Sequence, residues 1–184
     1  MTLYQIIKSD YSKHHNYGAG FFVIIFFTQG FWAAFQYRIA NYIHVHLKFK
    51  PLRVFFLAIL VIWKKIIEIL TGISISGSAT IDHSFYIGHF GGIIINADAI
   101  IGNNCNISQG VTIGISGIGT KRGVPVIGNN VYIGANSVVA GKITIGDNVL
   151  IGACSMVNRS LPDNVTVLGV PAVIVYEKGS KGYI

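Results

Sequence analysis

The chain has few charged residues and only two cysteines. Charged side chains make up 11% of its 184 residues and apolar ones 52%, which excludes an intrinsically disordered chain. Cys105 and Cys154 are too few for a disulfide scaffold or a four-cysteine zinc site, and their small-residue positions predict core thiols. There is also no P-loop or dinucleotide fingerprint in a strand–helix context. The length suits one domain with an appendage.

Charge, aromatic residues and glycine are unevenly distributed along the chain. The net charge is +7, and residues 1–72 carry eight Lys/Arg against two Asp/Glu, whereas residues 73–184 carry six against five. Sixteen of the 22 aromatic residues precede residue 73, and 18 of the 22 glycines follow Gly72. We therefore expect a hydrophobic, basic subdomain over residues 1–72, a second domain over residues 73–176, and a tail over residues 177–184.

Aliphatic residues recur every six positions in the second part. The series is Ile75, Ile81, Ile87, then Ile95, Ile101, Ile107, Ile113, then Ile127, Ile133, Val139, Ile145, Ile151, Val157. This hexapeptide period is typical of a parallel β-helix, in which three hexapeptides close one triangular coil. We expect the aliphatic side chains to point inward, and Gly or Asn at the corners to tolerate positive φ.

The six-residue register is broken twice. The first break lengthens one repeat to eight residues with the extra pair Gly91-Gly92, and the second lengthens one to 14 through a loop at residues 114–125. Repeats accept insertions where these loop out of the prism, and such loops often form the binding face. We expect the chemistry at these two breaks; the alternative is that they are neutral surface loops.

The first part of the chain shows helical spacing of apolar residues. One run extends from Phe31 to Ile43 and another from Leu52 to Leu70, where Pro51 can start the helix and Gly72 can end it. Lysines and arginines flank these runs. Two interpretations stay open, namely packing on neighbouring subunits and a basic, aromatic face lying on an anionic membrane.

The apolar blocks of this part are short. Phe21–Phe27 has seven residues and Val54–Trp63 has ten, which is typical of buried or interfacial helices rather than spans. The N-terminus does not have the pattern of a signal peptide. We therefore expect a cytoplasmic protein, with the inner face of the membrane as the open alternative.

Several segments resemble the serine acetyltransferase branch of the hexapeptide-repeat acyltransferases. They lie within residues 30–176 and are Gln36-Tyr37-Arg38-Ile39-Ala40, Gly88-His89-Phe90-Gly91-Gly92-Ile93, Ser108-Gln109-Gly110-Val111-Thr112-Ile113-Gly114, Pro125-Val126-Ile127-Gly128 and Leu168-Gly169-Val170-Pro171-Ala172. The resemblance implies a mainly β fold, a left-handed parallel β-helix with an N-terminal α-helical subdomain. It also implies a homotrimer, which could pair with a second trimer through the helices, and acetyl-CoA as acetyl donor.

In that family a histidine in the first register break is the general base, and His89 holds that place. A neutral imidazole titrates near the working pH and can take the proton of an acceptor hydroxyl, so no covalent acyl-enzyme is needed. The family's orienting acid would fall at Ser74. What orients His89 therefore stays open, among a backbone carbonyl, a water and a nearby side chain such as Asp82.

Two further departures concern the acceptor. The family's aspartate before the histidine is Gly88 here, and its Arg-His pair before the loop's proline is Gly123-Val124. Because these groups help to hold the amino acid in serine acetyltransferases, their loss argues against serine. Enzymes that acetylate sugar hydroxyls in capsule, O-antigen and exopolysaccharide synthesis share such departures. We therefore expect a sugar or polysaccharide acceptor, with Tyr86 and Gln109 as candidate substrate-binding residues.

The resemblance also places acetyl-CoA in a groove between adjacent prisms. The candidate cofactor-binding residues are Gly114 and Gly117 at the loop start, Ala135 and Ala153 at stacked corners, and the basic residues Lys121, Arg122, Arg159 and Lys178. Small residues let the cofactor approach the backbone, and basic ones can bind its phosphates. Taken singly, each could instead be corner packing or solvated surface. A backbone N–H near Gly114 or the Gln109 side chain could stabilise the oxyanion.

Three other functions are alternatives for a chain with this repeat. They are serine O-acetylation in cysteine biosynthesis, a non-catalytic β-helix scaffold, and a metal enzyme of the γ-class carbonic anhydrase kind. The last needs three histidines, and only His83 and His89 lie in the repeat, so we expect no metal. The basic residues are interleaved with apolar ones rather than gathered in a stripe, so nucleic acid is not an expected partner.

Overall fold

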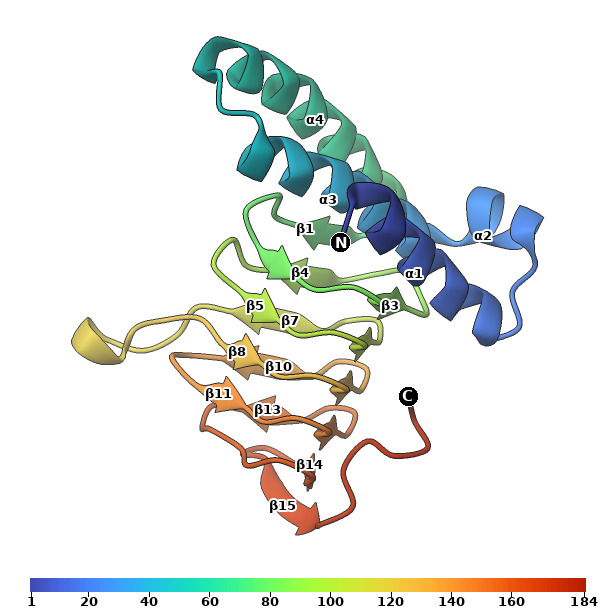
Figure 1. Ribbon diagram of the computed structural model, residues 1–184. Helices are drawn as coiled ribbons and strands as arrows, with labels where there is room; N and C mark the ends of the chain where they lie inside the picture. Colours follow the sequence, from blue (N-terminus) through green and yellow to red (C-terminus); the bar gives the residue numbers. More distant parts are fainter.

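The chain forms a three-sided β-helix with four helices at one end, in a computed structural model that describes residues 1–184 (Figure 1). The helices are α1 (Leu3–Asn16), α2 (Phe21–Phe27), α3 (Gln29–His46) and α4 (Lys50–Thr71). α3 and α4 cover the two predicted apolar runs. Pro51 lies in the first turn of α4, and Gly72 ends that helix with a left-handed φ of 67°. None of the helices combines the length and apolarity needed to cross a membrane.

The strands stack into three sheets, one for each face of the prism. The first face holds β1 (Ile73–Ile75), β4 (Ile93–Ile95), β7 (Thr112–Gly114), β10 (Val138–Ala140) and β13 (Met156–Val157). The second holds β2 (Thr80–Ile81), β5 (Ile100–Ile101), β8 (Val126–Ile127) and β11 (Thr144–Ile145). The third holds β3 (Tyr86–Ile87), β6 (Asn106–Ile107), β9 (Tyr132–Ile133), β12 (Leu150–Ile151), β14 (Thr166–Leu168) and β15 (Val173–Tyr176). Only the β14–β15 pair is antiparallel.

The strands pair in the register that the hexapeptide period predicts. Ile87 lies opposite Ile107, and Ile107 lies opposite Ile133. The inward aliphatic side chains belong to one core cluster of 30 buried residues. The predicted β-helix with an N-terminal helical subdomain is confirmed. The predicted core thiol is confirmed for Cys105, which is buried, but is wrong for Cys154, which is exposed because it occupies a left-handed corner position with φ of 58°.

The corner between the second and third faces carries a ladder of asparagines. Asn104, Asn130, Asn148 and Asn164 all have φ between 53° and 61°, a conformation that asparagine tolerates. Each side-chain amide donates to the next carbonyl oxygen, at 2.7, 2.9 and 2.9 Å. Lys13 of α1 caps the ladder, with its Nζ 2.6 Å from the Asn104 Oδ1. Burial lowers the pKa of Lys13 to about 8.

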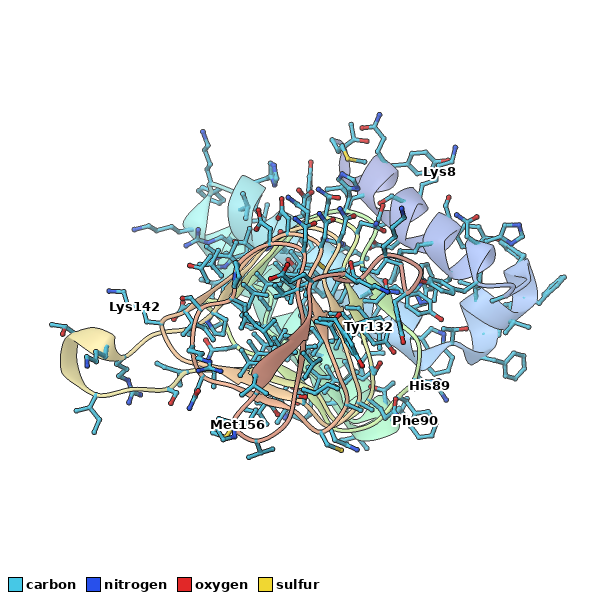
Figure 2. All side chains as sticks on the ribbon, turned by 90° about the horizontal axis from the view of Figure 1, so that it is seen from below. Lys8, His89, Phe90, Tyr132, Lys142 and Met156 are labelled. Atoms are coloured by element: carbon cyan, nitrogen blue, oxygen red, sulfur yellow. The ribbon has the colours of Figure 1, made fainter.

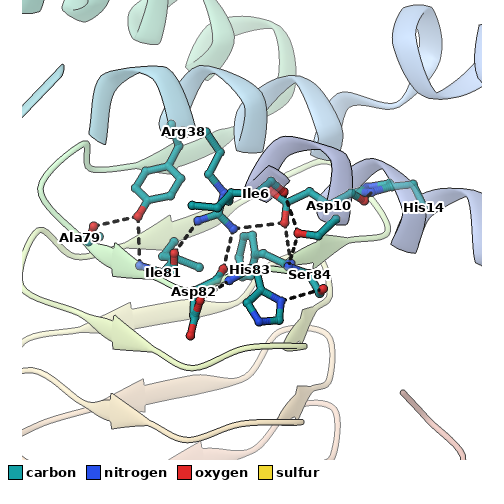
Figure 3. A network of polar contacts seen from close by, with 12 residues as sticks. Ile6, Asp10, His14, Arg38, Ala79, Ile81, Asp82, His83 and Ser84 are labelled. Carbon is teal, nitrogen blue, oxygen red and sulfur yellow. Dashed lines mark hydrogen bonds and ion pairs between the residues drawn. The ribbon is translucent and has the colours of Figure 1, made fainter. Parts of the chain in front are cut away.

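The helices dock on the open end of the prism through buried polar groups (Figure 3). Arg38 of α3 pairs with Asp10 of α1 at 2.8 Å, and its guanidinium also donates to the Ile81 and Asp82 carbonyls. The Tyr37 hydroxyl donates to the Ala79 carbonyl at 2.8 Å and accepts the Ile81 N–H at 3.0 Å. These bonds satisfy backbone groups at the edge of the first coil, which has no preceding coil to pair with.

Candidate active site

Four of the predicted site residues lie in one column, at the corner between the third and first faces. His89 follows β3, Gln109 follows β6, Ala135 follows β9 and Ala153 follows β12. Backbone hydrogen bonds link the successive corners: Gly110 donates to Gly91 at 2.8 Å, Asn136 to Gln109 at 2.9 Å, and Cys154 to Ala135 at 2.8 Å. The alanines therefore stack one coil apart, as their spacing of 18 predicts, and His89 begins the same column.

The extra glycine pair shapes the segment that carries His89. Gly91 and Gly92 have φ of 100° and 66°, which other residues rarely adopt, and the Gly91 N–H donates to the Thr71 carbonyl at 2.8 Å. The His89 side chain is exposed and has no hydrogen-bond partner within the chain. Figure 2 shows it beside Phe90, on the same side of the prism as Tyr132. Its ring is therefore free to meet a ligand.

Neither Asp82, the candidate orienting side chain, nor Ser74, which stands where the family's acid would fall, is hydrogen-bonded to His89. Asp82 lies at the preceding corner, where its Oδ1 accepts the His83 N–H at 2.7 Å. The Ser74 hydroxyl donates to Glu68 Oε1 at 2.6 Å. The imidazole is therefore held by no other side chain of this chain.

A groove of about 680 Å³ runs beside this corner, over the third face. Of the predicted site residues it is lined by His89, Gln109, Ala135, Ala153 and Lys178. Its other polar and aromatic lining residues are Ser108, Tyr132, Thr166, Tyr176, Lys181 and Tyr183. No acidic side chain lines the groove. Tyr86 does not line it either, because its ring stacks on Tyr17 at 4.3 Å and lies 4.6 Å from His14, under α1.

The second register break lies at another corner, between the first and second faces (Figure 1). There residues 115–123 project as a hairpin that contains a short 3₁₀ turn, η1 (Gly119–Lys121). Ser116 and Gly123 exchange two backbone hydrogen bonds, of 3.1 and 3.0 Å. Gly117 is required in the hairpin, since a Cβ there would lie 2.3 Å from the Lys121 carbonyl oxygen. Within one chain, Gly114, Gly117, Lys121 and Arg122 are thus not brought to the His89 groove.

Arg159 lies on the same side as the hairpin. It follows β13, at the last corner between the first and second faces, and its Nη2 donates to the Ala172 carbonyl at 2.8 Å. Figure 2 shows Lys142 near the projecting hairpin and far from His89. The predicted cofactor residues therefore fall into two groups on different corners, one with His89 and one with the hairpin.

Comparison with known proteins identifies the family. The bacterial transferase hexapeptide family (six repeats) matches residues 125–159. A serine acetyltransferase of Bacillus subtilis is 34% identical over 161 residues, which cover 88% of this chain and 70% of that protein. A protein named as the colanic acid biosynthesis acetyltransferase WcaB of Escherichia coli K12 is 40% identical over 137 residues, covering 74% of this chain and 84% of that one. This chain belongs to the hexapeptide-repeat acetyltransferases.

Solved structures support the assignment of this chain to the acetyltransferase family. Serine acetyltransferase of Brucella abortus in complex with coenzyme A matches 95% of this chain and 68% of that one, with a TM-score of 0.83 and 28% identity. The match to the Synechococcus elongatus serine acetyltransferase covers 61% of this chain and 46% of that protein.

The tail of this acetyltransferase forms one wall of the groove, which sequence reasoning missed except for Lys178. After β15 the chain turns back along the third face. Ser180 donates from its N–H to Asn148 and from its hydroxyl to Asn130, and the Tyr17 hydroxyl donates to the Tyr183 carbonyl at 3.2 Å. Lys181 and Tyr183 reach the groove by this path, which has no periodic signal in the sequence.

Proposed function

We propose that the protein is an O-acetyltransferase that moves acetyl from acetyl-CoA to a hydroxyl of a sugar or polysaccharide unit, in the cytoplasm. His89 would act as the general base: its neutral imidazole takes the hydroxyl proton while the hydroxyl oxygen attacks the thioester carbonyl. The tetrahedral intermediate then collapses, the C–S bond breaks, and the imidazolium returns the proton to the departing thiolate. No covalent acyl-enzyme forms.

The donor would lie along the column below His89. Ala135 and Ala153 leave room for a thin pantetheine chain beside the backbone, and Lys178 lies in the same groove. The Gln109 side chain lines the same groove, and its amide would donate to the oxyanion. The proposal includes a homotrimer. In it, the groove of each subunit would be completed by residues of the neighbouring subunit, namely Gly114, Gly117, Lys121, Arg122 and Arg159. The Brucella abortus relative solved with coenzyme A supports this donor.

The acceptor class rests on one observation, the absence of acidic side chains from the groove. A bound amino acid brings an ammonium group, which is costly to desolvate without an anionic partner. The groove instead offers Tyr132, Tyr176 and Tyr183, whose rings and hydroxyls suit the apolar faces and hydroxyls of a sugar. Similarity to a protein named for colanic acid biosynthesis points the same way.

Serine is the second candidate acceptor. It is favoured by the Bacillus subtilis serine acetyltransferase, whose match covers 88% of this chain. Acceptor profiling with labelled acetyl-CoA separates the two. We expect turnover of sugar or oligosaccharide acceptors to exceed that of L-serine, and the reverse order would overturn the sugar proposal. A purified protein that binds no acetyl-CoA would instead support the scaffold alternative.

The role of His89 is tested by His89→Ala. We expect kcat to fall about 100-fold or more, because general-base catalysis contributes roughly this much, while the Kd for coenzyme A stays within about twofold. His83→Ala is the matched control, since His83 lies at the preceding corner, beside Ser84, and does not line the groove. Full activity in His89→Ala would refute the assignment.

A further inference from the structure

The outer face of α4 is apolar along its whole length. Seven residues, 42 to 77% exposed, make up this α4 outer face: Leu52, Phe55, Ile59, Ile62, Ile66, Ile69 and Leu70. At 100° per residue they fall within one sector of the helix, separate from the sector of the buried Leu60, Ile67 and Thr71 that face α3 and the first coil. Figure 1 shows α4 extending beyond the edge of the prism. No part of the chain covers this face.

Helix α2 adds a second exposed apolar surface. Phe21, Phe22, Val23, Phe26 and Phe27 are 49 to 72% exposed. An apolar hollow of about 260 Å³, lined by six apolar residues including Ile25, Trp32 and Trp63, lies between α2, α3 and α4. Free surfaces of soluble proteins rarely carry so much apolar area, so this surface has an occupant.

The charge of the helices indicates what covers this apolar surface. Both acids of residues 1–72 are neutralised internally, since Asp10 pairs with Arg38 and Glu68 pairs with Lys64 and Lys65. By contrast, Lys48, Lys50 and Arg53, around the exposed Phe49 at the α3–α4 turn, have no acidic partner. A second copy of this region would bring like charges together, whereas an anionic lipid surface complements them.

We propose that the α4 outer face and α2 dock the protein peripherally on an anionic membrane. The apolar side chains would enter the boundary between headgroups and acyl chains, and the basic α3–α4 turn would contact lipid phosphates. The proposal is independent of the acceptor, although it would hold the groove near an acceptor carried by a lipid.

Flotation of the full chain with vesicles tests the docking. We expect binding to vesicles of phosphatidylcholine with phosphatidylglycerol, weakening as salt is raised, and little binding to phosphatidylcholine alone. Ile62→Ser/Ile66→Ser should reduce the partition coefficient about tenfold or more, because it removes apolar surface from the contact. The matched control is Val173→Ser/Ile174→Ser, on similarly exposed apolar residues of β15 at the opposite end of the prism.

A separate variant tests how much the basic α3–α4 turn contributes to vesicle binding. Lys48→Gln/Lys50→Gln should weaken binding about 25-fold, from about fivefold per lost charge near the surface. Lys142→Gln, an exposed lysine on the prism, should leave it unchanged. Each variant is first checked for unchanged circular dichroism and elution volume.

Three results would overturn the proposal. They are a protein that stays unbound at low salt, equal binding to neutral and anionic vesicles, and unchanged binding by Ile62→Ser/Ile66→Ser. If the wild type binds no vesicles and forms a larger assembly than this variant in solution, a second copy covers the face instead. Acetyl transfer to a soluble acceptor should survive in every variant, so failure of docking is distinguishable from failure of the proposed function.

Discussion

At the scale of single residues, an acid is present beside Ser74 after all. Ser74 stands where the family resemblance expects the orienting carboxylate, and its hydroxyl donates to Glu68 in the last turn of α4. Burial raises the pKa of Glu68, but hydrogen bonds from Lys65 and Ser74 and the charge of Lys64 lower it more, to about 2. A carboxylate therefore ties the end of α4 to β1 at neutral pH.

This carboxylate predicts a pH dependence of stability. The folded pKa of Glu68, about 2, lies below its ordinary 4.5, so the group stabilises the folded state above pH 4.5 and loses that contribution as pH falls towards 2. We expect Glu68→Gln to lower the free energy of unfolding by about 1 kcal/mol at neutral pH, and the difference to vanish in acid. Urea unfolding across this range measures it. Glu177→Gln, at an exposed tail residue, should behave as wild type; an unchanged difference in acid would contradict the assignment.

Part of the site was predictable because the repeat fixes it. A break in a strict period marks the segment that carries His89, whose role the family resemblance implies, and a spacing of 18 residues stacks Ala135 on Ala153. The period says nothing of Tyr183 or Lys181, because the tail's course depends on contacts of Ser180 with distant corner residues. Contacts between residues so far apart in the chain produce no local sequence pattern.

At the scale of elements, α3 lies against the first coil where one residue must be small. Gly30 lies in the first turn of α3, and a Cβ there would come 2.1 Å from the Ile87 carbonyl oxygen and 2.8 Å from the Ile87 Cβ. The contact brings α3 onto the strand that leads into the His89 corner. Glycine disfavours a helix by about 1 kcal/mol relative to alanine. Its presence in α3 is therefore explained by the close approach of Ile87, which leaves no room for a Cβ, and not by a need for backbone freedom.

Gly30→Ala should therefore destabilise the protein, although alanine is the better helix former. We expect a loss of about 2 kcal/mol or more in unfolding free energy, because α3 must shift off β3 to relieve the overlap. Gly20→Ala is the control: Gly20 precedes α2 with open space around its Cα, and its substitution should change stability by less than about 0.5 kcal/mol. Thermal unfolding of both variants measures the difference. Equal melting temperatures for Gly30→Ala and Gly20→Ala would show that α3 can shift at no cost in stability.

The elements differ in how far the sequence predicts them, for a physical reason. The β-helix and the helices α3 and α4 follow from apolar periodicity, and Pro51 and Gly72 lie at the start and the end of α4 as the sequence suggests. Helix α1 was not predicted, because its buried residues are the polar Asp10, Lys13 and His14. A helix that docks through ion pairs and hydrogen bonds leaves no apolar stripe to recognise.

At the scale of the whole molecule, the two register breaks lie at different corners of the prism. His89 belongs to the corner between the third and first faces, and the hairpin at residues 115–123 projects from the corner between the first and second. If both serve one reaction, a hairpin must reach the His89 groove of another copy. Closed rotational symmetry provides this, since each copy then offers its hairpin to one neighbour and its groove to the other.

Complementation between two impaired variants tests this arrangement. His89→Ala removes the base, and Lys121→Ala/Arg122→Ala should lower kcat/KM about tenfold or more, since it removes charge-assisted contacts to the cofactor phosphates. In a trimer that contains both variants, one of the three interfaces joins an intact groove to an intact hairpin, so the activity of the proposed mixed trimers should rise towards about a third of wild type. Co-expression with two affinity tags isolates the mixed trimers. Activity no greater than the sum of the separate variants would mean that the groove and the hairpin do not act together across subunits.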